Sequence, residues 1–168
     1  MTGTVAEPAA QVEQWLSSFE DALARGDAAT ASELFLEDSY WRDLVALTWN
    51  LKTVEGPEGV RDMLEATLAD AKPRAFATTE EPTEAEGVTE GWFEFETETG
   101  RGHGILRLRD GKAWTLLTAL RELKGHEEPR GMARPLGAST ARIATARPGW
   151  RPAAARPRSS ATRASPTS

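Results

Sequence analysis

The stretch ARGDAATASELFLEDSYWRD, residues 24–43, decides how the fold begins. Just before it, apolar side chains recur at helical spacing from Val12 to Leu23, and Gly26 is a residue type that commonly ends a helix. Asp27 is a natural N-cap for a second, short helix, because its carboxylate can accept hydrogen bonds from the first free amides. The run from Tyr40 to Thr48 is aromatic and favours a strand. The stretch therefore predicts two closely paired helices followed by a strand.

The rest of the folded part is predicted to form one more helix followed by strands. A third helix begins near Pro57, a good first-turn residue, and Lys72-Pro73 ends it. Asp110-Gly111 is a strong two-residue hairpin signal. Four strands are predicted around it, over residues 74–79, 87–99, 102–109 and 112–124.

The last of these strands is apolar on both faces. Ala113, Leu117 and Ala119 alternate with Trp114 and other apolar residues. A strand of this kind needs cover on both sides, and the helices supply only one. We therefore expect a homodimer packed sheet to sheet, with a locally apolar surface as the alternative.

Composition excludes several classes of protein. The 168 residues and 18.3 kDa suit one domain. With no cysteine and two histidines, disulfides, thiolate chemistry and a metal site are not expected. No apolar run approaches the roughly 18 residues that a membrane span needs, so a cytoplasmic protein without membrane contact is expected.

Charge divides the chain sharply. Residues 1–128 hold 26 acidic and 12 basic side chains, a net charge of −14, whereas residues 129–168 hold eight arginines and no acid, a net charge of +8. We predict a folded domain over 8–125, a linker over 126–138 and a disordered Ala/Arg/Pro/Ser/Thr-rich tail over 139–168. Arginines can attract nucleic acid, but a solvated biased segment explains the tail equally well, so no nucleic-acid partner is expected. A shifted reading frame of a GC-rich gene would encode the same residue types.

The order helix, helix, strand, helix and antiparallel meander resembles the NTF2-like fold. This resemblance implies an α+β cone, with three N-terminal helices packed on a curved antiparallel β-sheet around a cavity. The opening stretch, from Phe19 through Gly26-Asp27 to Asp43, is similar to that of SnoaL-like polyketide cyclases and ketosteroid isomerases.

A narrower resemblance is to the N-terminal module of bacterial flavin-containing monooxygenase-like oxidoreductases. It rests on four segments, at residues 39–43, 48–50, 114–118 and 123–131. In that family a flavoprotein that uses FAD and NADPH follows the module. Here no G-x-G-x-x-G motif occurs, and Gly100-Arg101-Gly102-His103-Gly104 lies between predicted strands, so no cofactor is expected in this chain.

Asp43 is the candidate catalytic residue. It stands where the resembled isomerases carry their carboxylate base, and a carboxylate in an apolar cone could move protons near neutral pH. Phe19 stands where those enzymes carry a phenol, so the oxyanion donor is missing. The plainer interpretation of Asp43 is a capping or salt-bridging residue.

Aromatic residues and a few polar anchors would line a site for a small apolar molecule, although core packing explains the aromatics equally well. The candidate ligand-binding residues are Trp15, Phe19, Tyr40, Trp41, Trp49, Asn50, Trp114 and Thr118.

Two functions follow from these residues together with the resemblances. The first is a module, non-catalytic or weakly catalytic, that binds a small apolar ligand, dimerises and serves as the front part of a flavin-dependent oxidoreductase. The second is a stand-alone isomerase, cyclase or epoxide hydrolase with Asp43 as general base.

Overall fold

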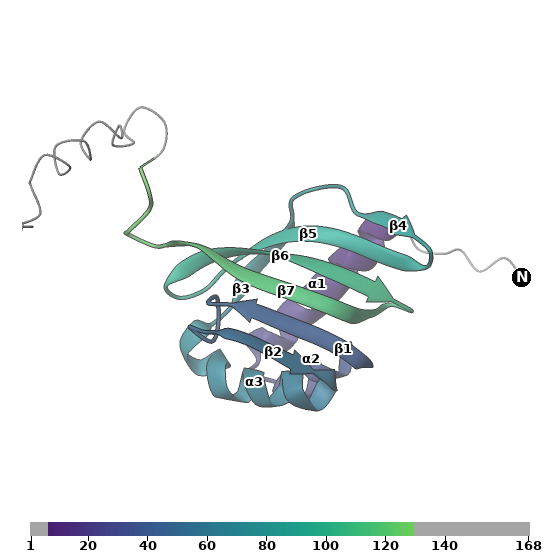
Figure 1. Cartoon of the computed structure of the whole chain (residues 1–168), viewed down its shortest axis with the longest axis horizontal. Helices are drawn as coiled ribbons and strands as arrows, with labels where there is room; N and C mark the ends of the chain where they lie inside the picture. Colours follow the sequence, from purple (N-terminus) through teal and green to yellow (C-terminus); the bar gives the residue numbers. More distant parts are fainter. Residues whose placement is uncertain (1–6, 130–168) are drawn as a thin grey trace, which may run out of the picture. The chain divides into compact units, whose positions relative to one another are not determined.

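The structure, a computed structural model, describes residues 7–129. In chain order its elements are α1 (Pro8–Ala24), α2 (Ala28–Glu33), β1 (Phe35–Leu44), β2 (Leu51–Glu55), α3 (Gly56–Ala71), β3 (Arg74–Thr78), β4 (Thr83–Ala85), β5 (Val88–Glu96), β6 (Gly100–Arg109) and β7 (Lys112–Leu123) (Figure 1).

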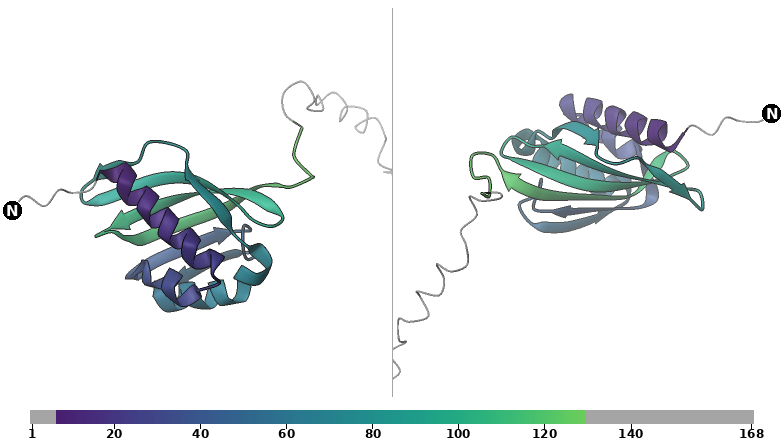
Figure 2. Two further views of the ribbon diagram at one scale, coloured as in Figure 1. Left: turned by 180° about the vertical axis from the view of Figure 1, so that it is seen from behind. Right: turned by 90° about the horizontal axis from the view of Figure 1, so that it is seen from above.

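The strands form one curved seven-stranded sheet in the order β2-β1-β7-β6-β5-β3, and β4 pairs with β5. Helix α1 lies diagonally across one face of the sheet (Figure 2, left), while Figure 1 looks onto the opposite face, which no helix of the described chain covers. The apolar core lies between the sheet and the three helices. We call the face away from α1 the outer face.

Two features of the expected architecture need correction. Only α1 and α2 precede the first strand, because α3 follows β2. The sheet is mixed rather than wholly antiparallel, since β1 and β7 pair in parallel. The meander β5-β6-β7 reverses direction twice, so β7 runs parallel to β5, and β7 also runs in the same direction as β1, its other neighbour.

The opening stretch folds as its residues predict. Pro8 begins α1, Gly26 follows it at a positive φ of 67°, and the Asp27 carboxylate accepts a 3.0 Å hydrogen bond from the Thr30 amide at the start of α2. The hairpin signal is confirmed as well, because Asp110 and Gly111 both adopt positive φ, as a type I′ turn requires.

The first predicted strand is displaced along the chain. It begins five residues earlier than expected, at Phe35, and ends at Leu44. Residues 45–50 form a loop, and the five-residue strand β2 that follows it was not predicted, nor was the three-residue β4. Both strands are too short to display a clear alternation of buried and exposed side chains.

Aromatic rings fill the inside of the cone. Trp15, Phe19, Phe35 and Trp41 contact one another, and Phe19 touches Phe76 with ring centroids 5.7 Å apart. Phe76 continues the cluster to two rings of β5, Phe93 and Phe95.

Glycines of β6 make room for the β5 rings. A Cβ at Gly102 would lie 2.5 Å from Cζ of Phe95, and one at Gly104 would collide with Phe93. Gly102 and Gly104 therefore serve ring packing across neighbouring strands, a role that the sequence did not suggest, whereas a Cβ at Gly100 would meet the Leu120 side chain.

The predicted domain over 8–125 lies within the described residues. The linker over 126–138 begins inside them, and the tail over 139–168 lies outside them. Of the helices that the structure describes, none is long and apolar enough to cross a membrane.

Candidate functional site

Asp43 lies inside the cone on β1 and is 0% exposed. Its Oδ1 accepts a 2.7 Å hydrogen bond from the Thr118 hydroxyl on β7. Its Oδ2 accepts three more, from the Leu47 amide at 3.1 Å, the Thr48 amide at 2.9 Å and the Thr48 hydroxyl at 2.8 Å. Trp41 donates from Nε1 to the Thr118 oxygen at 2.9 Å. The carboxylate therefore has a full set of donors within the domain.

The hydrogen bonds to Asp43 hold the β1–β2 loop, residues 45–50, whose backbone is unusual. Val45 and Trp49 have φ of 68° and 54°, values that a β-branched or bulky residue rarely adopts. Backbone of this kind persists only where surrounding contacts fix it. Three of the four hydrogen bonds to Asp43 come from residues 47 and 48 of this loop, so Asp43 joins the β1–β2 loop to the core.

The structure brings part of the expected ligand site together. Trp15, Phe19 and Trp41 belong to one aromatic cluster, and Trp41 is linked to Asp43 through Thr118. These three aromatic side chains and the Thr118 side chain are all buried. The rings pack against one another, and the Thr118 hydroxyl bonds to Trp41.

The remaining candidates lie elsewhere. Tyr40 is 46% exposed on the outer face, one residue out of phase with Trp41. Trp49 is 58% exposed in the β1–β2 loop, beside an exposed Asn50. Trp114 lies under the Arg109 guanidinium, whose central carbon is 5.0 Å from the ring centroid. Period-two alternation and loop geometry separate residues that are neighbours in sequence.

The outer face carries a row of side chains at directly opposed positions on neighbouring strands. The row runs from Trp92 on β5 through Ile105 and Leu117 to Arg42 on β1. Trp92 is 40% exposed. The other three, Ile105, Leu117 and Arg42, line a hollow of about 320 Å³ between Tyr40 and Arg107. We call these four residues the outer row.

Surface ion pairs flank the row. Arg107 pairs with Glu90 on β5 at 2.7 Å, and Arg109 pairs with Asp38 on β1 at 2.6 Å.

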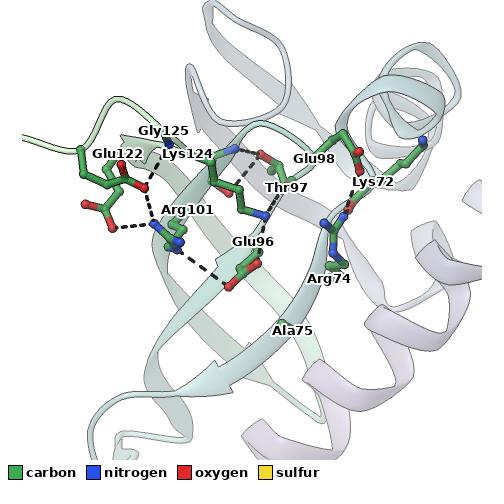
Figure 3. Close-up of polar contacts among 12 residues, drawn as sticks. Lys72, Arg74, Ala75, Glu96, Thr97, Glu98, Arg101, Glu122, Lys124 and Gly125 are labelled. Carbon is green, nitrogen blue, oxygen red and sulfur yellow. Dashed lines mark hydrogen bonds and ion pairs between the residues drawn. The ribbon is translucent and has the colours of Figure 1, made fainter.

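A network of charges holds the end of the sheet where the chain leaves the domain (Figure 3). Arg101 on β6 reaches Glu122 at 3.3 Å and Glu127 at 3.2 Å, and Lys124 pairs with Glu96 at 2.9 Å. The Lys124 hydrogen bond is the main cause that lowers the pKa of Glu96 below its ordinary 4.5. Exposed pairs of this kind contribute little each, but together they fix the direction of residues 125–127.

A larger groove lies between the C-terminal halves of α1 and α3 and has a volume of about 790 Å³. Leu23, Leu64 and Leu68 line it, with Arg25 and Lys72 among the charged residues. Sequence reasoning missed it, because the groove exists only where two helices distant in sequence end side by side. Within residues 7–129, no group of three or more acidic or histidine side chains is placed to hold a metal ion.

Comparisons with known proteins give evidence about the fold. No protein-family model matches the sequence, and no curated protein matches it. Solved structures do match. An NTF2-like protein of unknown function from Burkholderia xenovorans is similar at 13% identity and a TM-score of 0.50, covering 73% of this chain and 89% of that one.

Two further neighbours carry functional descriptions. A Bacillus subtilis protein provisionally described as an isomerase matches at 17% identity and a TM-score of 0.51, covering 68% of this chain and 88% of that one. A Xanthomonas campestris protein provisionally described as a calcium/calmodulin dependent protein kinase II association domain matches at 15% identity and a TM-score of 0.51. The match covers 66% of this chain and 85% of that one. Likeness at this level of identity shows the fold alone, and the described part of this chain has an NTF2-like α+β fold.

Proposed function

We propose that this domain is an association module that pairs with a second copy through the outer face of its sheet. The observation that carries the proposal is the outer row: Trp92, Ile105 and Leu117 lie side by side on a face that no described helix covers. Contiguous exposed apolar side chains mark interaction sites, and tryptophan and tyrosine often anchor them.

Charge and shape favour a copy of the same chain as the partner. The row ends in a cation, Arg42 on β1, and its other end lies beside Glu94 on β5. A two-fold axis through the middle of the row would set each arginine over the acidic end of the other copy. The same rotation would bring Trp92 of each copy toward the hollow between Tyr40 and Arg107 of the other. One neighbouring fold is described as an association domain, which agrees with this use of the fold.

The inside of the cone supports assembly rather than catalysis as the main role. Asp43 is engaged by four hydrogen bonds, and Trp15, Phe19 and Trp41 pack against one another. The small apolar ligand expected for the cone remains a prediction. The alternative, Asp43 as the base of an isomerase, cyclase or epoxide hydrolase, is kept because one neighbour is provisionally described as an isomerase.

We also propose, on the sequence resemblance alone, that the module serves a bacterial, cytoplasmic flavin-dependent oxidoreductase. Reading the gene beyond codon 138 in all three forward frames tests this link. A frame that continues into a glycine-rich dinucleotide motif is expected, and its absence from every frame would refute the link.

Light scattering on the full chain across a concentration series tests dimerisation. The wild type is expected to be a dimer. Leu117→Glu, which places a charge in the outer row, is expected to be a folded monomer, and Trp92→Ser is expected to weaken the dimer. Trp49→Ser is the matched control, because Trp49 is more exposed than Trp92 but lies outside the row. A wild-type monomer at every concentration, or a Leu117→Glu variant that stays dimeric, would overturn the proposal.

A further inference from the structure

The groove between α1 and α3 combines an apolar floor with a charged rim. Leu23 and Leu64 are buried at its floor, and Leu68 is partly exposed in it. Arg25 is the C-cap residue of α1 and Lys72 the C-cap residue of α3, so the two cations stand where the two helices end.

The acids at the rim already have partners. The Glu20 carboxylate accepts hydrogen bonds from the amides of Ala75 and Phe76, at 2.7 and 3.2 Å. Glu65 pairs with Arg61 at 2.8 Å. Their negative charges are therefore partly compensated within the domain.

The cations at the rim differ in this respect. Arg74 bonds to Glu98 at 3.3 Å and to the Lys72 carbonyl at 3.2 Å, and the Lys72 ammonium points away from this pair (Figure 3). Among the described residues, no hydrogen bond or ion pair engages the Arg25 guanidinium or the Lys72 ammonium. The acid nearest to Arg25 in sequence, Asp27, is hydrogen-bonded to Thr30, which is the main cause that lowers the pKa of Asp27; the positive charge of Arg25 lowers this pKa further without a hydrogen bond between the two side chains. The groove thus offers two available cations beside an apolar floor.

We propose that this groove binds a small amphiphilic carboxylate, whose apolar part covers Leu23, Leu64 and Leu68 and whose carboxylate meets Arg25 and Lys72. Burial of the apolar part supplies affinity, and charge-assisted hydrogen bonds select the acid over a neutral or cationic analogue. The site is separate from the outer row and from Asp43, so it does not depend on the proposed dimer.

The competing explanation is that both cations only stabilise the helix ends through the negative end of the helix dipole. Lys72 offers a way to separate the two roles. Its φ of 43° lies in the left-handed region, which glycine adopts without strain. Lys72→Gly therefore removes the ammonium while relieving the backbone, so a loss of binding in this variant does not come from a weakened fold.

Amide NMR spectra of the full chain, titrated with octanoate and with octylammonium, test the proposal. Octanoate is expected to shift the amides of residues 23–26 and 64–72, and octylammonium to bind much more weakly. The double variant Arg25→Gln/Lys72→Gly is expected to bind octanoate on the order of tenfold more weakly, since about 1.4 kcal/mol corresponds to a factor of ten.

The matched control is Lys112→Gln/Arg121→Gln, which removes two exposed cations far from the groove in sequence and lowers the net charge equally. This control should bind octanoate as the wild type does. The proposal is overturned if octanoate leaves the groove amides unshifted, if octylammonium binds as well as octanoate, or if both double variants weaken binding to the same extent.

Discussion

The Thr118 hydroxyl donates a 2.7 Å hydrogen bond to the buried Asp43 carboxylate from the directly opposed position on the parallel neighbouring strand. The same hydroxyl oxygen accepts from Trp41 Nε1. One threonine therefore satisfies both a buried indole and one oxygen of a buried carboxylate, and β1 and β7 are joined by side chains as well as by backbone.

Replacing Thr118 with valine should be costly. Valine keeps the shape but leaves the Trp41 indole without an acceptor and Asp43 Oδ1 without a donor. We expect a loss of about 1–3 kcal/mol in the free energy of unfolding, measured by urea denaturation. Thr115→Val, on the outer face of the same strand, is the control and should change stability by less than about 0.5 kcal/mol. Equal effects of the two variants would contradict the role assigned to Thr118.

Asp43→Asn separates the structural role of Asp43 from the catalytic one. An amide cannot accept on both sides, so either the loop amides or Thr118 lose their acceptor. We expect the variant to lose about 1–3 kcal/mol of stability, measured in the same way. The catalytic alternative expects instead unchanged stability and the loss of turnover of an enone or epoxide that the wild type converts.

Gly102→Ala should destabilise the fold, because the added Cβ would lie 2.5 Å from Cζ of Phe95 and 2.8 Å from the Ala119 carbonyl oxygen. Overpacking of this kind typically costs about 1–3 kcal/mol. Phe95→Leu shortens the ring side chain, so the double variant should lose less stability than the two single variants added together. A double-mutant cycle in urea measures the difference, and strict additivity would show that the Phe95 ring does not set the requirement for glycine.

Ala75→Gly should stabilise the protein. Ala75 has a φ of 57°, which strains a residue with a Cβ. Relief of this strain is opposed by the greater freedom of glycine in the unfolded chain, so we expect a gain of a few tenths to about 1 kcal/mol. Ala77→Gly, on the same exposed strand but without positive φ, is the control and should lose about 0.5–1 kcal/mol. Thermal unfolding distinguishes these outcomes, and destabilisation by both variants would contradict the expectation.

The pKa of Glu96 should lie below its ordinary value of 4.5, first because Lys124 donates a hydrogen bond to its carboxylate and further because Lys124, Arg101 and Arg74 are positively charged. A lowered pKa in the folded state means that the stability contributed by this carboxylate is present above about pH 4.5 and is lost as the pH falls through the folded value. Carboxyl-carbon NMR titration measures the pKa directly. Lys124→Met should raise it toward 4.5, and an unchanged pKa in that variant would show that Lys124 is not the main cause.

Local sequence signals were enough to predict the three helices and the strands of the C-terminal meander, but not the short strands β2 and β4. Helical spacing in residues 12–23, the cap at Asp27 and the turn at Asp110-Gly111 are local signals, because each depends on residues within one or two turns of chain. The fold class followed from the resemblance that this order of elements carries.

Which side chains meet depends on the tertiary structure. Asp43 finds Thr118 seventy-five residues away, and Gly102 receives the ring of Phe95 from the neighbouring strand. Tyr40 and Trp41 are adjacent in sequence but lie on opposite faces, because side chains alternate along a strand. The groove with Arg25 and Lys72 likewise depends on where two helices end. Such contacts are set by strand register and helix packing. Both depend on residues far apart in the chain, so composition and local spacing do not predict them.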